Sequence, residues 1–424
     1  MSCLAIKGGP KVRYQNFPAH VTTGAEEKEA VVSVLSSGIL SNYLGAKHEN
    51  FMGGKFVRKF EDACCSFWGV DHALAVNSNT SGLISALGAI ELKPLDEVLV
   101  VSYSMTISAT APLFWGAIPI FVDVEEDYYC MDANKIEQLI TQKTRAILVV
   151  NLFGQVYDYQ KINAIAKRHN LYVIEDSAQA PFAKTPYGLA GTLGDIGVFS
   201  LNYHKHIHSG EGGIIVTNDA LLAEKCALIR NHAEAVDDGK FGNLVGYNFR
   251  MTEIEAAIAE QQLLKLTSLM DERLENVVYF EEQFSEFEFL QMPKKRSDCD
   301  HCYYGHPIKL KTKEINNKTF AEALRAELSP FDLREKEGVK IGGGYVPPIY
   351  RLPLFQKSGG SKTLANQTLS LSWQDFESCL CPVTENLHDR ELLTHEFIVP
   401  SMTKNDILDV KAAFEKVWSN RKEL

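Results

Sequence analysis

Short apolar runs alternate with amphipathic segments through the first two thirds of the chain. Residues 20–38 have a helical pattern with acidic side chains in the first turn. Residues 55–68 also have helical spacing, with four side chains on one face: Phe56, Phe60, Cys64 and Phe67. From residue 73 onward the pattern predicts strands over residues 73–76, 97–101, 118–122, 146–150, 171–174, 196–199 and 213–217. Helices are predicted between them over residues 81–90, 133–140 and 159–169.

Alternation of this kind is typical of an α/β fold, in which helices cover both faces of a mostly parallel sheet. A long helix is predicted over residues 253–275, leading out of the sheet. Beyond it the pattern changes to fewer strands with mixed helices, including residues 317–328 and 404–418. We therefore expect two domains. Residues 1–275 would form a large domain with an N-terminal helical segment, and residues 276–424 a smaller α+β domain.

Composition limits the class of partner. The 424 residues are 45% hydrophobic and 23% charged, as in ordinary globular proteins. The formal net charge of -11 argues against nucleic acid, which needs a basic surface. No apolar run reaches the roughly eighteen residues of a membrane span, so no membrane insertion is expected. The apolar part of the N-terminus is too short for a secretory signal, and nine cysteines without a regular framework suggest a cytoplasmic location.

Two cysteine pairs could in principle supply thiolates to zinc. Cys299 and Cys302 have the usual two-residue gap, but Cys379 and Cys381 are separated by a single residue. This spacing argues against zinc, and no metal site is predicted. The alternative is that these cysteines are small, partly buried apolar side chains.

Lys205 and Asp176 carry the clearest chemical signal. Lys205 lies between two predicted strands and shortly before the glycine-rich turn at residues 210–213. An amine held on such a loop can form an imine with a carbonyl compound. Asp176 follows the predicted strand at 171–174, and an aspartate there can face a pyridinium nitrogen. Either residue alone has an ordinary explanation, a surface lysine or a helix-capping acid, but the pair predicts a pyridoxal-phosphate enzyme.

Polar segments follow three of the predicted strands, at residues 77–80, 102–105 and 176–179. Since ligands on parallel sheets bind beyond the carboxyl ends of the strands, these segments are expected to meet in one crevice. The run at 76–82 begins a helix and suits a phosphate group, although such runs are more often plain N-caps. Ser200, five residues before Lys205, adds a hydroxyl of the kind that phosphate sites use.

Ordered motifs along nearly the whole chain resemble the DegT/StrS family of sugar aminotransferases, which share the type I aminotransferase fold. The resemblance is carried by GKFVRKFE at 54–61, HALAVNSNT at 72–80, NLFGQ at 151–155, EDSAQA at 175–180, GEGG at 210–213 and GYNFRMTE at 246–253. It implies that Lys205 is the Schiff-base lysine, Asp176 the partner of the pyridinium nitrogen, and Gln179 the partner of the cofactor's ring hydroxyl.

The resemblance also implies how the rest of the site is built. Thr80 and Ser200 would hold the phosphate of pyridoxal 5'-phosphate within one subunit. Asn248 would reach the phosphate bound by a neighbouring subunit, which implies a homodimer with shared active sites. Tyr345 resembles a tyrosine on the substrate side.

Several positions depart from the family pattern. Asn79 stands where the family usually has glycine, and Met105 where an aromatic ring commonly stacks on the cofactor; both are expected to border it. Pro181 and Phe182 stand where His-Gly is frequent.

The implied activity is transfer of an amino group from an amino acid, with glutamate expected, to a keto-sugar that is most often nucleotide-linked. Three alternatives stay open. Residues 5–13 resemble the opening of members that aminate cyclitol ketones. A subset of the family replaces the lysine by histidine and dehydrates sugars, and His204 and His206 flank Lys205. The last alternative is a pyridoxal-phosphate-binding regulator without turnover. Lys205 is five residues from both Ser200 and Gly210, which assigns lysine to the key position.

Overall fold

A seven-stranded sheet forms the centre of the larger part of the molecule. The computed structural model describes residues 3–234, 244–356 and 381–424, and orders this sheet β1-β9-β8-β5-β4-β2-β3. The strands are β1 His72–Val76, β2 Glu97–Val101, β3 Ile118–Val122, β4 Thr144–Val150, β5 Tyr172–Asp176, β8 Ile196–Ser200 and β9 Gly213–Thr217. Strands β3, β2, β4, β5 and β8 pair in parallel, whereas β9 is antiparallel to β8 and β1. The predicted α/β class is confirmed.

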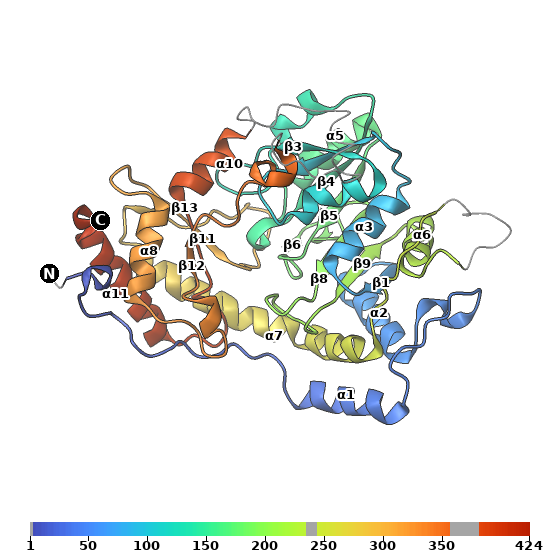
Figure 1. The fold of residues 1–424 in the computed structure, drawn as a ribbon, viewed down its shortest axis with the longest axis horizontal. Coiled ribbons are helices and arrows are strands. Elements are labelled where there is room, and N and C mark those ends of the chain that lie inside the picture. The colour runs from blue at the N-terminus through green and yellow to red at the C-terminus, as the bar shows by residue number, and fades with distance from the viewer. Residues whose placement is uncertain (1–2, 235–243, 357–380) are drawn as a thin grey trace.

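Helices cover this sheet, and their ends follow local sequence signals (Figure 1). They are α1 Ala25–Ser37, α2 Lys55–Trp68, α3 Asn79–Ala89, α4 Ile107–Thr110, α5 Tyr159–His169 and α6 Ala220–Arg230. The hydroxyl of Ser78 accepts the Ser81 N–H and caps α3. Gly69 ends α2 in the left-handed region, with φ 66°. Among the described helices, none is both long and apolar enough to cross a membrane.

The prediction of a helix over 133–140 is wrong. Two short 3₁₀ turns, Ala133–Lys135 and Glu137–Leu139, occupy this stretch. Their backbone bonds run from residue i+3 to residue i, as from Leu139 N–H to Ile136 C=O. Only Ala133 and Ile136 are buried here, so a continuous helix would gain little from packing.

Helix α7, Glu253–Phe284, is longer than the 253–275 predicted and joins two hydrophobic cores. Thr252 and Glu255 form a capping box at its start. Met270 belongs to the core around the large sheet, whereas Val277 belongs to a second core. Figure 1 shows α7 running beneath both parts of the molecule, with α1 below it. The helix crosses residue 275 without a break.

The second core lies around a four-stranded antiparallel sheet in the order β10-β11-β13-β12. Its strands are β10 Leu290–Gln291, β11 His306–Leu310, β12 Ile341–Gly343 and β13 Leu392–His395, and a hairpin elsewhere pairs β6 Lys184–Thr185 with β7 Gly188–Leu189. The helices of this half are α8 Asn317–Glu327, α10 Pro382–Asn386 and α11 Lys404–Ser419, so the helices predicted near 317 and 404 are confirmed.

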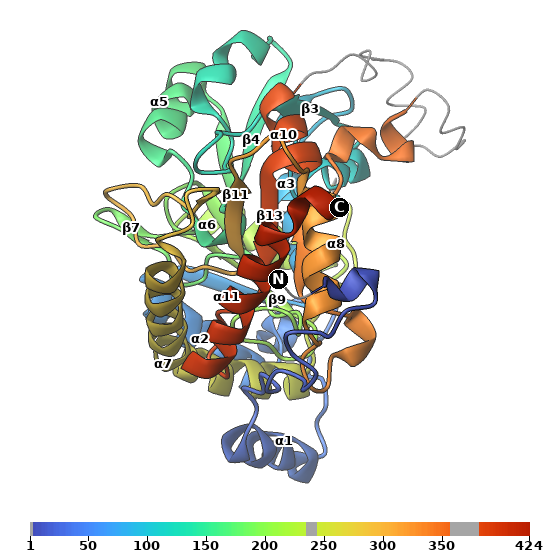
Figure 2. The ribbon, with the colours of Figure 1, turned by 90° about the vertical axis from the view of Figure 1, so that its left-hand side faces the viewer.

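One segment from each half of the chain packs in the core of the other half. Leu4 and Phe17 pack in the second core, and Figures 1 and 2 place the N-terminal segment beside α8 and α11. In the other direction, Ile349 and Tyr350 pack in the first core. A division of the chain into 1–275 and 276–424 stays a prediction.

Candidate active site

The loop that carries Lys205 connects two antiparallel strands, β8 and β9, and its backbone is pinned across its base. The Leu201 N–H donates to the Gly212 carbonyl at 2.9 Å, and the Lys205 N–H donates to the Asn202 carbonyl at 2.8 Å. At Gly213 the loop meets the start of α3 so closely that a Cβ would lie 2.6 Å from the Ser78 carbonyl carbon. The lysine loop and the first turn of α3 are therefore fixed relative to each other.

A cavity of about 490 Å³ lies above the carboxyl ends of β4, β5 and β8. Of the nine residues predicted for the site, it collects eight: Asn79, Thr80, Met105, Asp176, Gln179, Ser200, Lys205 and Tyr345. Asn248 does not line it. That residue is exposed, pairs with Asn231 in a β-bridge, and accepts a hydrogen bond from Arg250 at 2.9 Å.

Asp176 ends β5 and is 4% exposed. Its Oδ1 accepts hydrogen bonds from Asn79 Nδ2 at 3.2 Å and from the Ala178 N–H at 3.1 Å. Within the described part of the chain, no donor reaches Oδ2. Burial raises the pKa of Asp176, against the opposing effects of the Ala178 N–H, the Lys205 charge and the Asn79 amide. A cationic ring nitrogen on the cavity side would supply a counter-charge for this carboxylate.

Lys205 is half-buried in the same cavity. Burial lowers the pKa of its amine to about 8, and the negative charge of Asp176 partly opposes this shift. The Nζ atom lies 4.3 Å from the centroid of the Tyr304 ring. A lysine with a pKa near neutrality has a usable fraction of free amine, as a Schiff-base lysine requires.

Gln179 and Tyr345 are joined by a hydrogen bond. Gln179 Nε2 donates to the Tyr345 hydroxyl at 2.9 Å, while Gln179 Oε1 accepts the Phe153 N–H at 2.7 Å. The amide oxygen of Gln179 is therefore engaged, and its second N–H is left for a ligand in the cavity. The Tyr345 backbone N–H donates in turn to the Tyr103 hydroxyl at 2.7 Å, which fixes the position of this tyrosine.

The start of α3 agrees with both interpretations of residues 76–82, a helix N-cap and a phosphate site. Ser78 is an N-cap, as described above. The backbone N–H groups of Asn79 and Thr80, however, donate to no other atom of the described residues, and both residues line the cavity. Free N–H groups at a helix start attract an anion. Ser200 lines the same cavity, and its hydroxyl accepts the Asn202 N–H at 3.3 Å.

Tyr304 and His204 also line the cavity and were not predicted. Arg334 Nη2 lies 3.0 Å from His204 Nδ1, which leaves the proton of a neutral imidazole on Nε2. Tyr304 follows Tyr303, whose φ of 48° is left-handed. No local signal marks Tyr304, because it comes from the second half of the chain and reaches the lysine only through folding.

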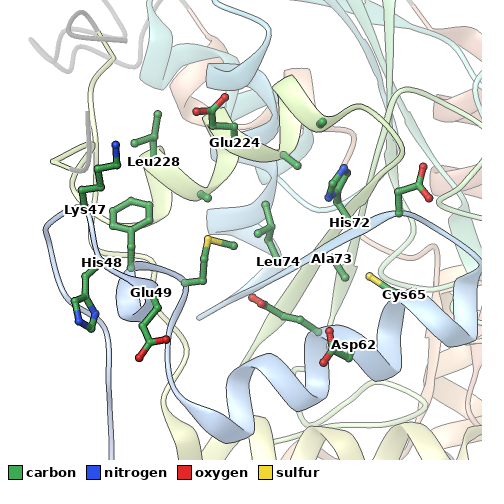
Figure 3. A pocket seen from close by; sticks show the side chains of 17 residues that line it. Lys47, His48, Glu49, Asp62, Cys65, His72, Ala73, Leu74, Glu224 and Leu228 are labelled. Carbon is green, nitrogen blue, oxygen red and sulfur yellow. The ribbon is translucent and has the colours of Figure 1, made fainter. Parts of the chain in front are cut away.

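The residues predicted for the site do not line the cavity between α2, β1 and α6, and the cysteine pairs form no metal cluster among the described residues. A separate cavity of about 590 Å³ lies between α2, β1 and α6 (Figure 3). Figure 3 shows Asp62, Cys65, His72 and Glu224 around it, and none of the predicted site residues lines it. The zinc interpretation gains no support, since the described residues hold no cluster of three metal-binding side chains. Cys379 lies outside them.

Comparison with known proteins identifies the class. Residues 24–414 match the model of the DegT/DnrJ/EryC1/StrS aminotransferase family, and the chain belongs to it. It is therefore a pyridoxal-phosphate-dependent aminotransferase, as predicted.

The relatives differ in the compounds that their names contain. GDP-perosamine synthase of Caulobacter vibrioides is 40% identical over 232 residues, which are 55% of this chain and 62% of that protein. An L-glutamine:2-deoxy-scyllo-inosose aminotransferase of Streptomyces lividus is 30% identical over 99% of both chains. The crystal structure of DesI in the presence of its TDP-sugar product has a TM-score of 0.82 at 24% identity, covering 99% of this chain and 97% of that one; this likeness concerns the fold.

The residues present fit the cofactor. The α3 N–H groups and Ser200 suit its phosphate, Asp176 its ring nitrogen, and Lys205 its aldehyde carbon. When bound, pyridoxal phosphate withdraws electrons from the substrate carbon. Asp176 would then keep a negative charge beside the ring nitrogen, and Lys205 Nζ would carry a proton between two carbon atoms.

Proposed function

We propose that this protein transfers an amino group from an amino acid, glutamate in the first instance, to a nucleotide-linked keto-sugar. The observation that carries the proposal is the single cavity that collects Lys205, Asp176 and the start of α3 in a chain of this family. The family membership supplies the reaction type, and the cavity supplies residues for each part of the cofactor.

The relatives support two kinds of acceptor. GDP-perosamine synthase and the DesI complex favour a nucleotide-linked sugar. The Streptomyces lividus relative, matched from end to end, favours a cyclitol ketone as the second candidate, with glutamine as donor. The resemblance of residues 5–13 to cyclitol enzymes points the same way.

The dehydratase and regulator alternatives have less support. A histidine-type dehydratase needs histidine where the cofactor binds. His204 does line the cavity, but its Nδ1 contacts Arg334 at 3.0 Å. His206 is buried away from the cavity, with its Nε2 3.1 Å from the Cys302 carbonyl oxygen. Lys205 lines the cavity, which supports the amino-transfer reaction. A regulator without turnover would bind the cofactor but would not accept an amino group from glutamate.

A homodimer with shared sites and a cytoplasmic location belong to the same proposal. Asn248 is exposed and outside its own subunit's cavity, as a residue that serves a neighbouring site would be. Exposed apolar side chains nearby, including Val245 at 56%, are compatible with a covered surface.

The test uses the protein purified with pyridoxal phosphate. Borohydride reduction followed by peptide mapping is expected to place the label on Lys205, and Lys205→Ala is expected to lose both label and turnover. Excess L-glutamate should convert the yellow cofactor to its aminated form. Nucleotide-linked keto-sugars and 2-deoxy-scyllo-inosose are then added separately, and only one of these two classes of ketone should restore the yellow form. Label on another lysine would contradict the proposal, and so would a cofactor that neither L-glutamate nor L-glutamine aminates.

A further inference from the structure

A second cavity, of about 250 Å³, adjoins the site on the other side of the lysine loop. His204, Lys205 and Tyr304 line both cavities, so the two adjoin at the reactive amine. The N-terminal segment closes one wall with His20 and Val21. The space is too small for a nucleotide but sufficient for a small acid.

Arg273 lines this second cavity and has no charged partner. It lies on α7, is 5% exposed, and donates one hydrogen bond, from Nη1 to the Tyr303 carbonyl at 3.0 Å. Within the described residues no carboxylate oxygen lies within 4.0 Å of it. A guanidinium has five N–H donors, and a buried charge is normally paired. Arg273 therefore has donors available for a ligand.

The guanidinium stays charged. Burial lowers the pKa of Arg273 to about 10, and the more distant Glu396 partly opposes this shift. At neutral pH the side chain is thus protonated. By contrast, burial lowers the pKa of His20 to about 4, so this neighbour is neutral.

The carboxylates of the second cavity are already neutralised. Arg334 pairs with Glu337 at 2.8 Å and with Glu396 at 2.6 Å, and Lys340 also pairs with Glu337. Both carboxylates that line the cavity are therefore held in ion pairs, whereas no described carboxylate pairs with the other two cationic side chains that line it, Lys205 and Arg273. A ligand with one negative group would place a counter-charge beside Arg273.

We propose that the second cavity binds a carboxylate of the amino-acid donor, with Arg273 as its counter-charge. The inference deepens the proposed function and rests on it for the identity of the ligand as the donor. The amine of the donor must reach the carbon that Lys205 holds, and the second cavity begins at Lys205. Arginine is the side chain best shaped to bind a carboxylate through two parallel hydrogen bonds.

The probe is glutarate, a dicarboxylate with no amine, which binds without reacting. Calorimetric titration of the yellow holoenzyme is expected to show glutarate binding that Arg273→Met weakens by about 10- to 100-fold, the range for a lost charged hydrogen bond. Arg273→Lys keeps the positive charge, so its affinity for glutarate should lie between those of the unaltered protein and Arg273→Met. The cofactor's absorbance and far-ultraviolet circular dichroism monitor the fold. Equal glutarate affinity in folded Arg273→Met and the unaltered protein would overturn the inference.

A second pair of variants avoids the buried position. Val21 lines the cavity and is 58% exposed, so substitutions there leave the core intact. Val21→Glu is expected to weaken glutarate binding about fivefold relative to its neutral match, Val21→Gln, because like charges repel across the cavity. Identical affinity in the two variants would overturn the assignment of the carboxylate to this cavity.

The two proposals fail separately. Arg273-dependent glutarate binding in a protein that aminates neither class of ketone would contradict the proposed function and support the carboxylate site. Amination of a nucleotide-linked sugar, with an unchanged glutamate half-reaction in Arg273→Met, would contradict the carboxylate site alone.

Discussion

The side-chain amide of Asn79 donates a hydrogen bond of 3.2 Å to the carboxylate of Asp176. The residue that departs from the usual glycine thus supports the acid that we propose for the cofactor's ring nitrogen. Asn79→Ala removes this donor and is expected to lower kcat/KM about tenfold, equivalent to about 1.4 kcal/mol, the scale of one charged hydrogen bond. Steady-state kinetics check it, and an unchanged kcat/KM would show that the amide is dispensable.

Asp176→Asn keeps the shape of the side chain and removes its charge. We expect turnover to fall at least about 100-fold, because a neutral amide does not hold the proton on the ring nitrogen. Thermal unfolding should change little. Asp195→Asn is the matched control, since that carboxylate accepts the Val173 N–H at the opposite end of β5. Full activity in Asp176→Asn would mean that the cofactor binds elsewhere.

The pH dependence of cofactor capture follows from the Lys205 amine. Its pKa is lowered from the ordinary value to about 8 by burial, and only the neutral amine reacts with an aldehyde. The rate at which the apoprotein captures pyridoxal phosphate should rise about tenfold per pH unit below 8 and level off above it. Stopped-flow absorbance measures this rate.

Asp176→Asn tests the direction in which the aspartate charge shifts the pH profile of cofactor capture. The aspartate charge favours the ammonium form, so its removal should shift the plateau to lower pH. A rate that kept rising toward pH 10, as for an exposed lysine, would contradict the buried position of the amine.

Asn248→Ala tests whether sites are shared between subunits. The variant should bind pyridoxal phosphate more weakly, since a donor to the neighbouring phosphate is lost. Mixed dimers with Lys205→Ala subunits should regain activity, because one of the two sites then has both residues intact. Activity of the mixture equal to that of the separate variants would argue for a site built within one subunit.

The buried ion pair between Glu61 and Arg230 should dominate the stability of the large core. Arg230 is 0% exposed and its Nη1 lies 2.6 Å from Glu61 Oε1, which also accepts the Ala75 N–H. Glu61→Ala leaves the buried guanidinium without its carboxylate, with backbone carbonyls as its remaining oxygen acceptors, and is expected to cost about 3–5 kcal/mol of unfolding free energy. Urea denaturation measures this loss.

The double variant Glu61→Leu, Arg230→Met is the control for that loss. It removes both charges together and should be less destabilised than Glu61→Ala. A cost below about 1 kcal/mol for Glu61→Ala would contradict the importance of the pair.

Local sequence patterns were sufficient to predict most strands of the large sheet and to single out Asp176 and Lys205. Apolar runs end where strands end, so the positions of the strands along the chain, and of Asp176 and Lys205 beside them, could be predicted from neighbours in the chain. The 133–140 stretch was mistaken for a helix because its side-chain spacing is helical while its packing is poor.

The sequence by itself determined the fold class and the family, and it predicted Lys205 and Asp176 as the reactive lysine and its acid. Only the tertiary structure brought Tyr304 over the lysine and placed Arg273 in a second cavity where no described carboxylate pairs with it. Arg273 in isolation is an ordinary helix residue, and no periodicity marks it. Its burial depends on how α7, the N-terminal segment and the second core pack together, and such contacts between distant segments leave no trace in local spacing.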